Sequence, residues 1–453
     1  MKKANVLYVF ADQLSMLALN IYGAHNRVYT PHIDQLAQKG VRFKKSYCVT
    51  PQCSPSRSAL LTGLYPHKTQ VIGNMGTMHT EPLDPQLPNL GNLLKAHGYR
   101  TAYFGKWHLG RTPITEYGFD VTADFHSNDE ETTDHALSFL EQQTDAKDRP
   151  WLCMVSYNNP HDIYHVVRNK LDGKPLDTSL IRLPDNFTDD LSTKPAAQRL
   201  FRDEDQGKPL KSYADKDWKY YLAYYYRLVE EIDRQFGRIV TKLKQTGLYE
   251  STLIVFTSDH GDLMAAHRTP YKGPMMYEEL VRIPLIYSWP GVLPEGASRD
   301  QLTVNADHLP TIIDLLGFEV PAQLDGISLK ASLFNREAPS REYVVMQYYS
   351  KQKWINPIRS VTDGRYKFNR YRSGEEELYD LSTDVAEVDN LANHPEYRDI
   401  KNRFAHEISR WMELHQDPFT QYVRTDREGN RVEETNSITQ SCVRSLKGAI
   451  DRS

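Results

Sequence analysis

The stretch Leu253-Ile254-Val255-Phe256-Thr257-Ser258-Asp259-His260-Gly261 is an apolar run that changes abruptly to polar residues. A short apolar run without polar alternation is typical of a strand buried on both faces of a parallel sheet. Comparable runs recur along the chain, and we predict such strands at 5–10, 101–104, 151–157, 251–257 and 283–288.

Helical segments separate these runs. Thr30 is placed to act as an N-cap with Pro31 at N1, in a helix that ends at Gly40, and residues 87–97 form a second helix. Residues 218–247 carry apolar side chains at helical spacing, which favours an amphipathic helix over an aromatic binding platform. The pattern predicts an α/β fold, a large doubly wound mixed or parallel sheet flanked by helices.

The pattern changes after residue 339. Short runs typical of antiparallel strands follow, with a turn at Asp363-Gly364, and they lie at 342–349, 358–362, 366–371 and 377–380. A helix is expected at 395–415, and a polar tail, either a surface wrap or partly disordered, from Asp417. We therefore predict a catalytic domain over 1–340 and a smaller C-terminal α+β subdomain, built on a short antiparallel sheet, over 341–453.

Composition narrows the classes of function. The net charge is -4 and the basic residues are scattered, which argues against a nucleic-acid partner. No apolar stretch approaches the roughly 20 residues of a membrane helix. The apolar run that follows Met1-Lys2-Lys3 is too short for a signal peptide. We expect a cytoplasmic protein, or a periplasmic or secreted one if the sequence begins after a removed signal.

Polar residues that suit metal binding follow two of the predicted strands. Asp12-Gln13 ends the first strand and Asp259-His260 ends the fourth. One Asp after a strand is commonly a cap or turn residue, but two such pairs supply the oxygen ligands that a hard divalent cation needs. Lys106 with His108, and His161, also follow strands.

The string Cys53-Ser54-Pro55-Ser56-Arg57, which continues to Leu61-Thr62-Gly63, resembles the type I sulfatase signature C-x-P-S-R-x-x-x-x-T-G. In that family, part of the alkaline-phosphatase superfamily, a maturation enzyme oxidises this cysteine to formylglycine. The alternative is that Cys53 is an ordinary buried thiol. The segment 98–108, ending in Gly105-Lys106-Trp107-His108, is similar to the second sulfatase signature.

The resemblance implies a role for each candidate catalytic residue. Cys53 supplies the nucleophile, Arg57 orients it and Asp259 assists its deprotonation. Lys106 and Lys272 hold the sulfate oxygens, while His161 protonates the leaving alcohol and His108 takes a proton during sulfate release. Lys272 is assigned from the segment 267–273, and the resemblance extends to about residue 393.

The resemblance also implies one divalent metal ion, held by Asp12, Gln13, Cys53, Asp259 and His260. Many sulfatases carry Asp-Asp and Asp-Asn at the two pairs, and Gln13 and His260 depart from that pattern. Ca²⁺ is the first candidate, because Asp-His also occurs at the second pair of calcium-dependent sulfatases, and Mn²⁺ or Mg²⁺ are alternatives. The imidazole of His260 weakens the case for calcium, since imidazole suits transition metals better. Related phosphonate monoester hydrolases carry the same variants.

We therefore predict a sulfatase that hydrolyses a small-molecule or oligosaccharide sulfate ester, with a sulfated carbohydrate favoured. Choline or aryl sulfates, a phosphonate monoester or phosphodiester substrate, and a non-catalytic binding protein remain alternatives. Specificity is expected from the loop 73–84 and from Trp354, Arg359 and Tyr371 in an outer pocket.

Overall fold

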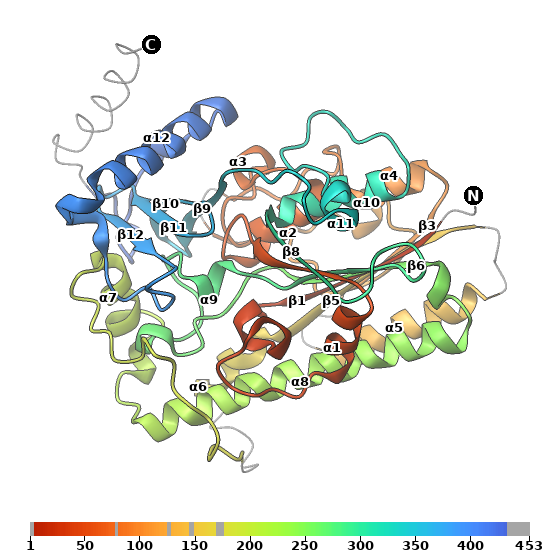
Figure 1. The fold of residues 1–453 in the computed structure, drawn as a ribbon, viewed down its shortest axis with the longest axis horizontal. Helices are drawn as coiled ribbons and strands as arrows, with labels where there is room; N and C mark the ends of the chain where they lie inside the picture. Colours follow the sequence, from red (N-terminus) through yellow and green to blue (C-terminus); the bar gives the residue numbers. More distant parts are fainter. Residues whose placement is uncertain (1–3, 78–79, 125–127, 145–148, 169–175, 433–453) are drawn as a thin grey trace.

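The computed structural model describes residues 4–77, 80–124, 128–144, 149–168 and 176–432. These residues form a large sheet covered by helices on both faces, with a smaller sheet and a long helix at the C-terminal end (Figure 1). The predicted α/β class is confirmed. The domain boundary near residue 340 remains a prediction, although the smaller sheet begins at Val344.

The large sheet is mixed. Its order is β4-β3-β5-β1-β6-β7-β2-β8. The bounds are β1 Asn5–Asp12, β2 Val41–Tyr47, β3 Arg100–Gly105, β4 Val121–Ala123, β5 Trp151–Pro160, β6 Thr252–Ser258, β7 Leu285–Ser288 and β8 Ala297–Val304. β1 lies between β5 and β6 and runs parallel to both.

The predicted strand at 283–288 differs from expectation, because β7 is antiparallel to both β6 and β2. After β6 the chain forms the connection 259–284 at the carboxyl edge of the sheet and re-enters the sheet from that same edge. A parallel strand would need a crossover that returns the chain to the opposite edge, so β7 runs antiparallel to β6. β2, β4 and β8 were not predicted. Their side chains are partly exposed, so they lack a continuous apolar signal.

Helices cover both faces of this sheet (Figure 1). Side chains of β1 alternate between two apolar clusters: Leu7 and Val9 pack with the long helix α8 (Asp215–Gln245), and Val6 and Tyr8 with α10 (His308–Leu315). The other helices are α1 Pro31–Gln38, α2 Cys53–Thr62, α3 Pro66–Thr69, α4 Leu90–Ala96, α5 Asp129–Gln142, α6 His165–Arg168, α7 Ala196–Glu204, α9 Glu278–Val281 and α11 Lys330–Phe334.

The helix predictions hold with two corrections. Thr30 precedes α1 but donates to the Asp34 carboxylate instead of capping the backbone. α4 begins at Leu90, because Asn89 caps it. The stretch at 218–247 lies in α8, whose tyrosines Tyr221 and Tyr225 are fully buried, so it is a packed helix and not an open aromatic platform.

The C-terminal sheet is antiparallel, in the order β12-β11-β10-β9. Its strands are β9 Val344–Lys351, β10 Trp354–Thr362, β11 Tyr366–Tyr371 and β12 Glu376–Asp380, and α12 (Arg398–His415) packs on them. The buried Lys367 ammonium joins the two parts of the chain, since it pairs with Glu278 at 3.0 Å and with Glu387 at 2.6 Å.

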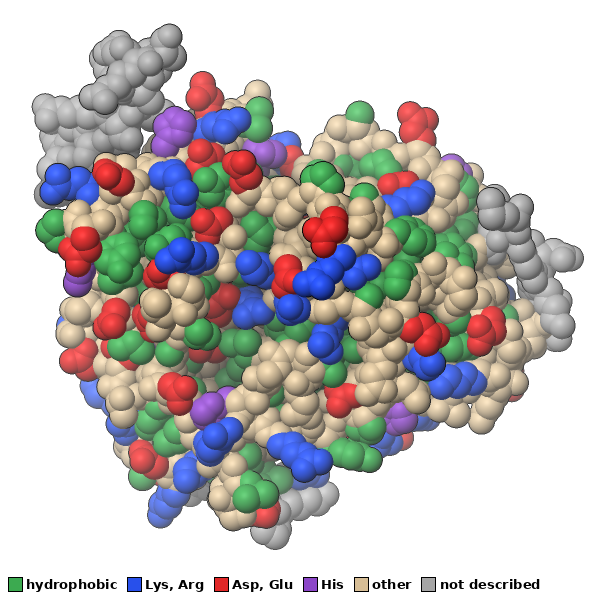
Figure 2. Space-filling view, in the orientation of Figure 1, with side chains coloured by type: hydrophobic (Ala, Val, Ile, Leu, Met, Phe, Trp, Pro, Cys, Tyr) green, Lys and Arg blue, Asp and Glu red, His purple; other side chains and the backbone are tan. Residues whose placement is uncertain are grey.

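The beginning of the polar tail is tied to this sheet. Asp417 accepts from the buried Arg359 guanidinium at 2.5 and 2.6 Å, and the Thr425 hydroxyl accepts from the Ile355 amide. The remainder of the predicted tail, 433–453, lies outside the described residues. Figure 2 shows basic and acidic side chains interspersed on one face of the molecule. Within the described residues, none of the helices has both the length and the apolar character needed to cross a membrane.

One buried histidine makes stability depend on pH. His308 is fully buried with its Nδ1 2.7 Å from the Tyr8 hydroxyl, and burial lowers its pKa to about 3. An unfolded chain takes up this proton near pH 6.5 and the folded chain does not, so stability falls as pH falls below that value. The expected contribution is about 1.4 kcal/mol per pH unit.

We predict that between pH 6 and 5 the unfolding free energy of His308→Gln falls by about 1.4 kcal/mol less than that of the wild-type protein. Denaturant titration at each pH measures it. His406→Gln, at a side chain 61% exposed, is the control. Equal slopes for the wild-type and His308→Gln proteins would contradict the prediction.

Candidate active site

The carboxyl ends of four neighbouring parallel strands meet at one edge of the large sheet. Asp12 ends β1, Lys106 follows β3, His161 follows β5 and Asp259 follows β6. Polar residues at this edge of an α/β sheet are placed for ligand binding. Lys106 is held there by Gly105, whose φ is +97° and where a Cβ would lie 2.0 Å from the Ser156 carbonyl oxygen.

Cys53 is the first residue of α2, and every residue of that helix is buried. Its Sγ lies 3.6 Å from Asp12 Oδ1 and 3.3 Å from His260 Nε2. The Ser56 hydroxyl, in the next turn, donates to the Asp259 carbonyl oxygen. The helix therefore places the thiol between the ends of β1 and β6.

Arg57 joins the two strand-end carboxylates. Its guanidinium donates through Nη2 to Asp12 Oδ2 at 2.8 Å and through Nε to Asp259 Oδ2 at 2.9 Å. Nη1 donates to the Lys106 carbonyl at 2.7 Å and to the Ser156 hydroxyl at 2.8 Å. Lys106 Nζ adds a second cation, 2.7 Å from Asp12 Oδ2.

The remaining donor atoms form a compact set. One ligand atom each from Asp12, Cys53, Asp259 and His260 lie within 4.8 Å of one another, and all four residues are buried. The other ring nitrogen of His260, Nδ1, lies 2.9 Å from the Gly261 carbonyl oxygen, which leaves Nε2 free to act as a ligand. Two carboxylates with one imidazole fit a single divalent cation.

Gln13 is oriented by its neighbours. Its side-chain Nε2 donates to Asp262 at 2.5 Å, and its Oε1 accepts from Lys272. Its backbone N donates to Asp259 Oδ1 at 3.0 Å, and its carbonyl oxygen accepts from Tyr225 at 2.8 Å. A role for Gln13 as a metal ligand remains a prediction.

Residues that carry no motif also hold this edge together. Asp262 is fully buried, and burial raises its pKa to about 6. Tyr221 accepts from the Tyr271 amide at 3.1 Å, next to Lys272. In the sequence Tyr221 indicated only the buried face of a helix. Asp262 lies three residues beyond Asp259, and no pattern in the sequence marked it as a residue of the site.

The two buried carboxyl groups, Asp12 and Asp259, differ in pKa. Burial favours a neutral Asp12, but Lys106, His161, Arg57 and Lys272 together outweigh it and hold its pKa well below the usual range. Burial and the Asp12 charge raise the pKa of Asp259. Asp12 is therefore the persistent anion of the pair.

The same cations act on Cys53. Burial and Asp12 favour the thiol, but Lys272, Lys106 and His260 prevail and lower its pKa well below the ordinary value. The position thus accommodates a negatively charged atom at Cys53.

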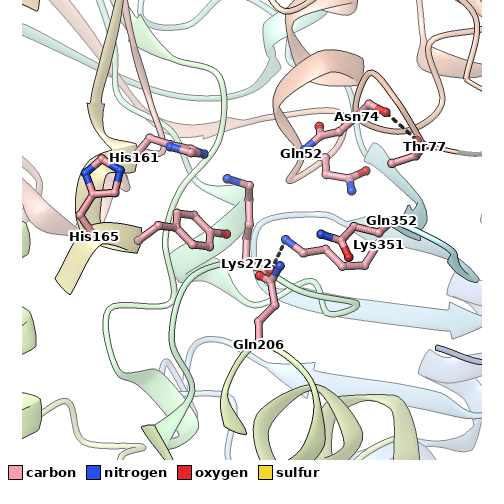
Figure 3. Close-up of a pocket in the computed structure, with 10 residues that line it drawn as sticks. Gln52, Asn74, Thr77, His161, His165, Gln206, Lys272, Lys351 and Gln352 are labelled. Atoms are coloured by element: carbon pink, nitrogen blue, oxygen red, sulfur yellow. Dashed lines mark hydrogen bonds between the residues drawn. The ribbon is translucent and has the colours of Figure 1, made fainter. Parts of the chain in front are cut away.

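A cavity of about 230 Å³ leads to this edge. His161 and Lys272 both line it, and the ends of their side chains point toward one another (Figure 3). Its lining residues are Gln52, Asn74, Thr77, His161, Tyr164, His165, Gln206, Lys272, Lys351 and Gln352. The predicted loop 73–84 therefore contributes through Asn74 and Thr77.

The prediction that three residues of the C-terminal sheet line the pocket is wrong. Trp354, Arg359 and Tyr371 are buried away from the cavity. Arg359 is committed to Asp417, and the Tyr371 hydroxyl bonds Gln198 and Glu377. Adjacent strand residues point to opposite faces, and the sequence did not show which face lines the cavity.

His108 follows Lys106 with a φ of 58°, and its buried Nδ1 has no hydrogen-bond partner among the described residues. It does not line the cavity. Its predicted role in sulfate release stays a prediction.

The sulfatase family model matches residues 4–318, and a model described as N-sulphoglucosamine sulphohydrolase, C-terminal, matches residues 267–414. The chain is 31% identical over 421 residues to a Delta 4,5-hexuronate-2-O-sulfatase of Bacteroides thetaiotaomicron, covering 88% of this chain and 86% of that protein.

Two solved structures extend the comparison. One, a 2-O GAG sulfatase, superposes with a TM-score of 0.86 at 28% identity, covering 97% of this chain and 99% of that one. A phosphonate monoester hydrolase from Silicibacter pomeroyi shares the fold, with a TM-score of 0.76 at 24% identity and coverage of 95% and 99%.

Removing the Arg57 guanidinium should destabilise the protein. Arg57→Met leaves two buried carboxylates without their shared counter-ion, and we expect a loss of about 3–5 kcal/mol in metal-free unfolding free energy. Denaturant unfolding in chelator measures it. Arg234→Met, which removes an exposed pair with Glu231, should cost at most about 1 kcal/mol. Equal losses in the two variants would refute the role of Arg57.

Proposed function

The chain belongs to the sulfatase family and is a sulfuric ester hydrolase, and from this premise we propose that its substrate is the sulfate ester of a carbohydrate. The cavity lining supports this substrate class. Gln52 Oε1 and Gln206 Oε1 are buried without hydrogen-bond partners among the described residues, and both residues line the cavity. Such acceptors suit sugar hydroxyls, and leaving them unpaired is costly.

The relatives support the same proposal, since one is named for a hexuronate sulfate and another for a GAG sulfate. The cavity volume of about 230 Å³ lies below the roughly 300–1,000 Å³ of typical small-molecule pockets, so one sugar ring is the expected occupant. We further propose that the sugar lies against Gln52 and Gln206 with its sulfate directed toward Lys272.

Cys53 is proposed to be the precursor of formylglycine. Addition of water to its aldehyde would give a geminal diol, in which one hydroxyl attacks sulfur and the other loses a proton when sulfate leaves and the aldehyde re-forms. Arg57 cannot rotate freely, because Asp12 and Asp259 hold two of its nitrogens. It therefore fixes the direction of residue 53. Asp259, whose pKa is raised, is suited to accept a proton from the attacking hydroxyl.

Lys106 and Lys272 are proposed to bind the sulfate oxygens and stabilise the charge of the transition state. In the free protein, burial and the repulsion of Lys106 hold the pKa of His161 well below its usual value. An anionic ester between the lysines offsets that repulsion. Substrate binding thus raises the pKa of His161, which can then protonate the leaving oxygen.

Asp12, Asp259 and His260, with residue 53 and Gln13, are proposed to hold one divalent ion, which would polarise the sulfate oxygens. Ca²⁺ is the first candidate because the carboxylates suit a hard cation, and Mg²⁺ is an alternative for the same reason. Mn²⁺ is the other alternative, because the set also contains the imidazole of a transition-metal site. We also propose that a maturation enzyme converts Cys53 to formylglycine. The proposed location is the cytoplasm, or the periplasm or the cell exterior if a signal has been removed.

The metal proposal predicts that Asp259→Ala loses both bound metal and turnover. The ion would lose a carboxylate, while the Arg57 charge would remain close by and repel it. Elemental analysis of the purified proteins measures metal per chain. Asp314→Ala removes a surface carboxylate outside the site and should leave metal content unchanged. An Asp259→Ala protein with wild-type metal content would refute the assignment.

The substrate proposal predicts that sulfate esters of sugars are hydrolysed faster than choline sulfate, aryl sulfates and phosphonate monoesters. The protein should be co-expressed with a maturation enzyme, and peptide mass spectrometry should show loss of the Cys53 thiol. Measurement of kcat/KM over this panel decides between the alternatives. Faster turnover of a phosphonate monoester than of every sulfate ester would establish the phosphonate hydrolase alternative.

A further inference from the structure

We propose that Lys351 binds a second anionic group of the substrate, a carboxylate or a second sulfate on the same sugar ring as the ester. This inference rests on the proposed function and adds a substrate feature to it. Lys351 is the last residue of β9, in the C-terminal sheet, and lies outside both sulfatase signatures.

The buried lysines divide into two groups. Three of them, Lys106, Lys194 and Lys367, have a carboxylate oxygen within 4.0 Å. Lys272 and Lys351 are also buried, yet within the described parts of the chain neither has a carboxylate at that distance, and their hydrogen-bond acceptors are the Gln13 amide oxygen and the Lys272 carbonyl oxygen. Both of these lysines line the same cavity.

The Lys351 ammonium has unused donors. It donates to the Lys272 carbonyl oxygen at 3.1 Å, and no second acceptor among the described residues lies within hydrogen-bond distance. Burial and the Lys272 charge lower the pKa of Lys351 to about 7, although Cys53 and Asp205 act in the opposite sense. A buried ammonium is costly without a counter-ion, and a bound anion would supply one.

The geometry allows one ligand to reach both lysines. Lys272 Nζ lies 5.3 Å and Lys351 Nζ 6.0 Å from the centre of the same Tyr164 ring. Figure 3 shows the two side chains next to each other, with His161 and His165 on one side and Gln52 and Asn74 on the other. None of the described lining residues is acidic, so a dianionic sugar meets no like charge.

The test compares substrates that differ by one charge. One pair is glucosamine 2-N,6-O-disulfate and N-acetylglucosamine 6-O-sulfate, and the other is a hexuronate 2-O-sulfate and its carboxyl methyl ester. Wild-type protein should favour the dianionic member of the pair it accepts. Which pair responds identifies the second anion as a sulfate or a carboxylate.

Lys351→Met should lower kcat/KM for the dianionic substrate by roughly 10- to 100-fold, mainly through KM, and leave the monoanionic partner within about twofold. Lys353→Met, at an exposed position two residues away, is the matched control and should change neither. Lys351→Met should also unfold at a higher temperature, because it removes a buried charge, so a loss of activity cannot be attributed to misfolding.

The outcomes separate the two proposals. If Lys351→Met weakens both members of a pair equally, or if wild-type protein shows no preference, the second anion site is refuted and the carbohydrate sulfatase proposal stands. If no sugar sulfate is hydrolysed by matured wild-type protein, the proposed function fails and the Lys351 proposal fails with it.

Discussion

The guanidinium of Arg57 balances two carboxylates that the sheet brings into one buried space. β1 and β6 are parallel neighbours, so Asp12 and Asp259 come together wherever the sheet forms. Without a cation, their repulsion would force a proton onto one of them. Arg57 binds the Oδ2 atom of each, and the Oδ1 atoms face Cys53 and His260. Because Arg57 and Cys53 are one turn apart in α2, the same contact fixes the helix and the thiol.

Around this centre three buried lysines differ in the groups that they contact. Lys106 neutralises Asp12, while Lys272 interacts with the Gln13 amide and no described carboxylate. Lys351, on the C-terminal sheet, lines the same cavity as Lys272. In the proposed function the two sheets contribute different groups: the large sheet would supply the reacting groups, and the small sheet would supply Lys351, which is suited to select among substrates.

Much of this arrangement was predictable from sequence, because continuous apolar runs mark buried parallel strands and polar residues at their ends mark one edge. The direction of β7 was not predictable from sequence, since an apolar run of four residues carries no information about the path of the preceding loop. Lys351 was also missed. In Ser350-Lys351-Gln352-Lys353 it resembles any surface lysine, but in the fold it is buried beside Lys272, Tyr164 and Phe201.

The antiparallel entry of β7 has a consequence for how such a protein diversifies. The loop 259–284 is anchored at both ends in adjacent strands and is pinned between them by Gln13, Asp262 and Tyr221, so its length cannot change without disturbing the chemistry. The turn between β9 and β10 is tied elsewhere: Gln352 and Lys353 are exposed at its tip, and the Lys353 carbonyl oxygen accepts a hydrogen bond from the Thr425 hydroxyl. Insertions and deletions accepted there would alter the rim of the cavity, where Gln352 lies, and the contact with Thr425, so this hairpin can evolve new substrate preferences while the proposed reacting groups stay unchanged.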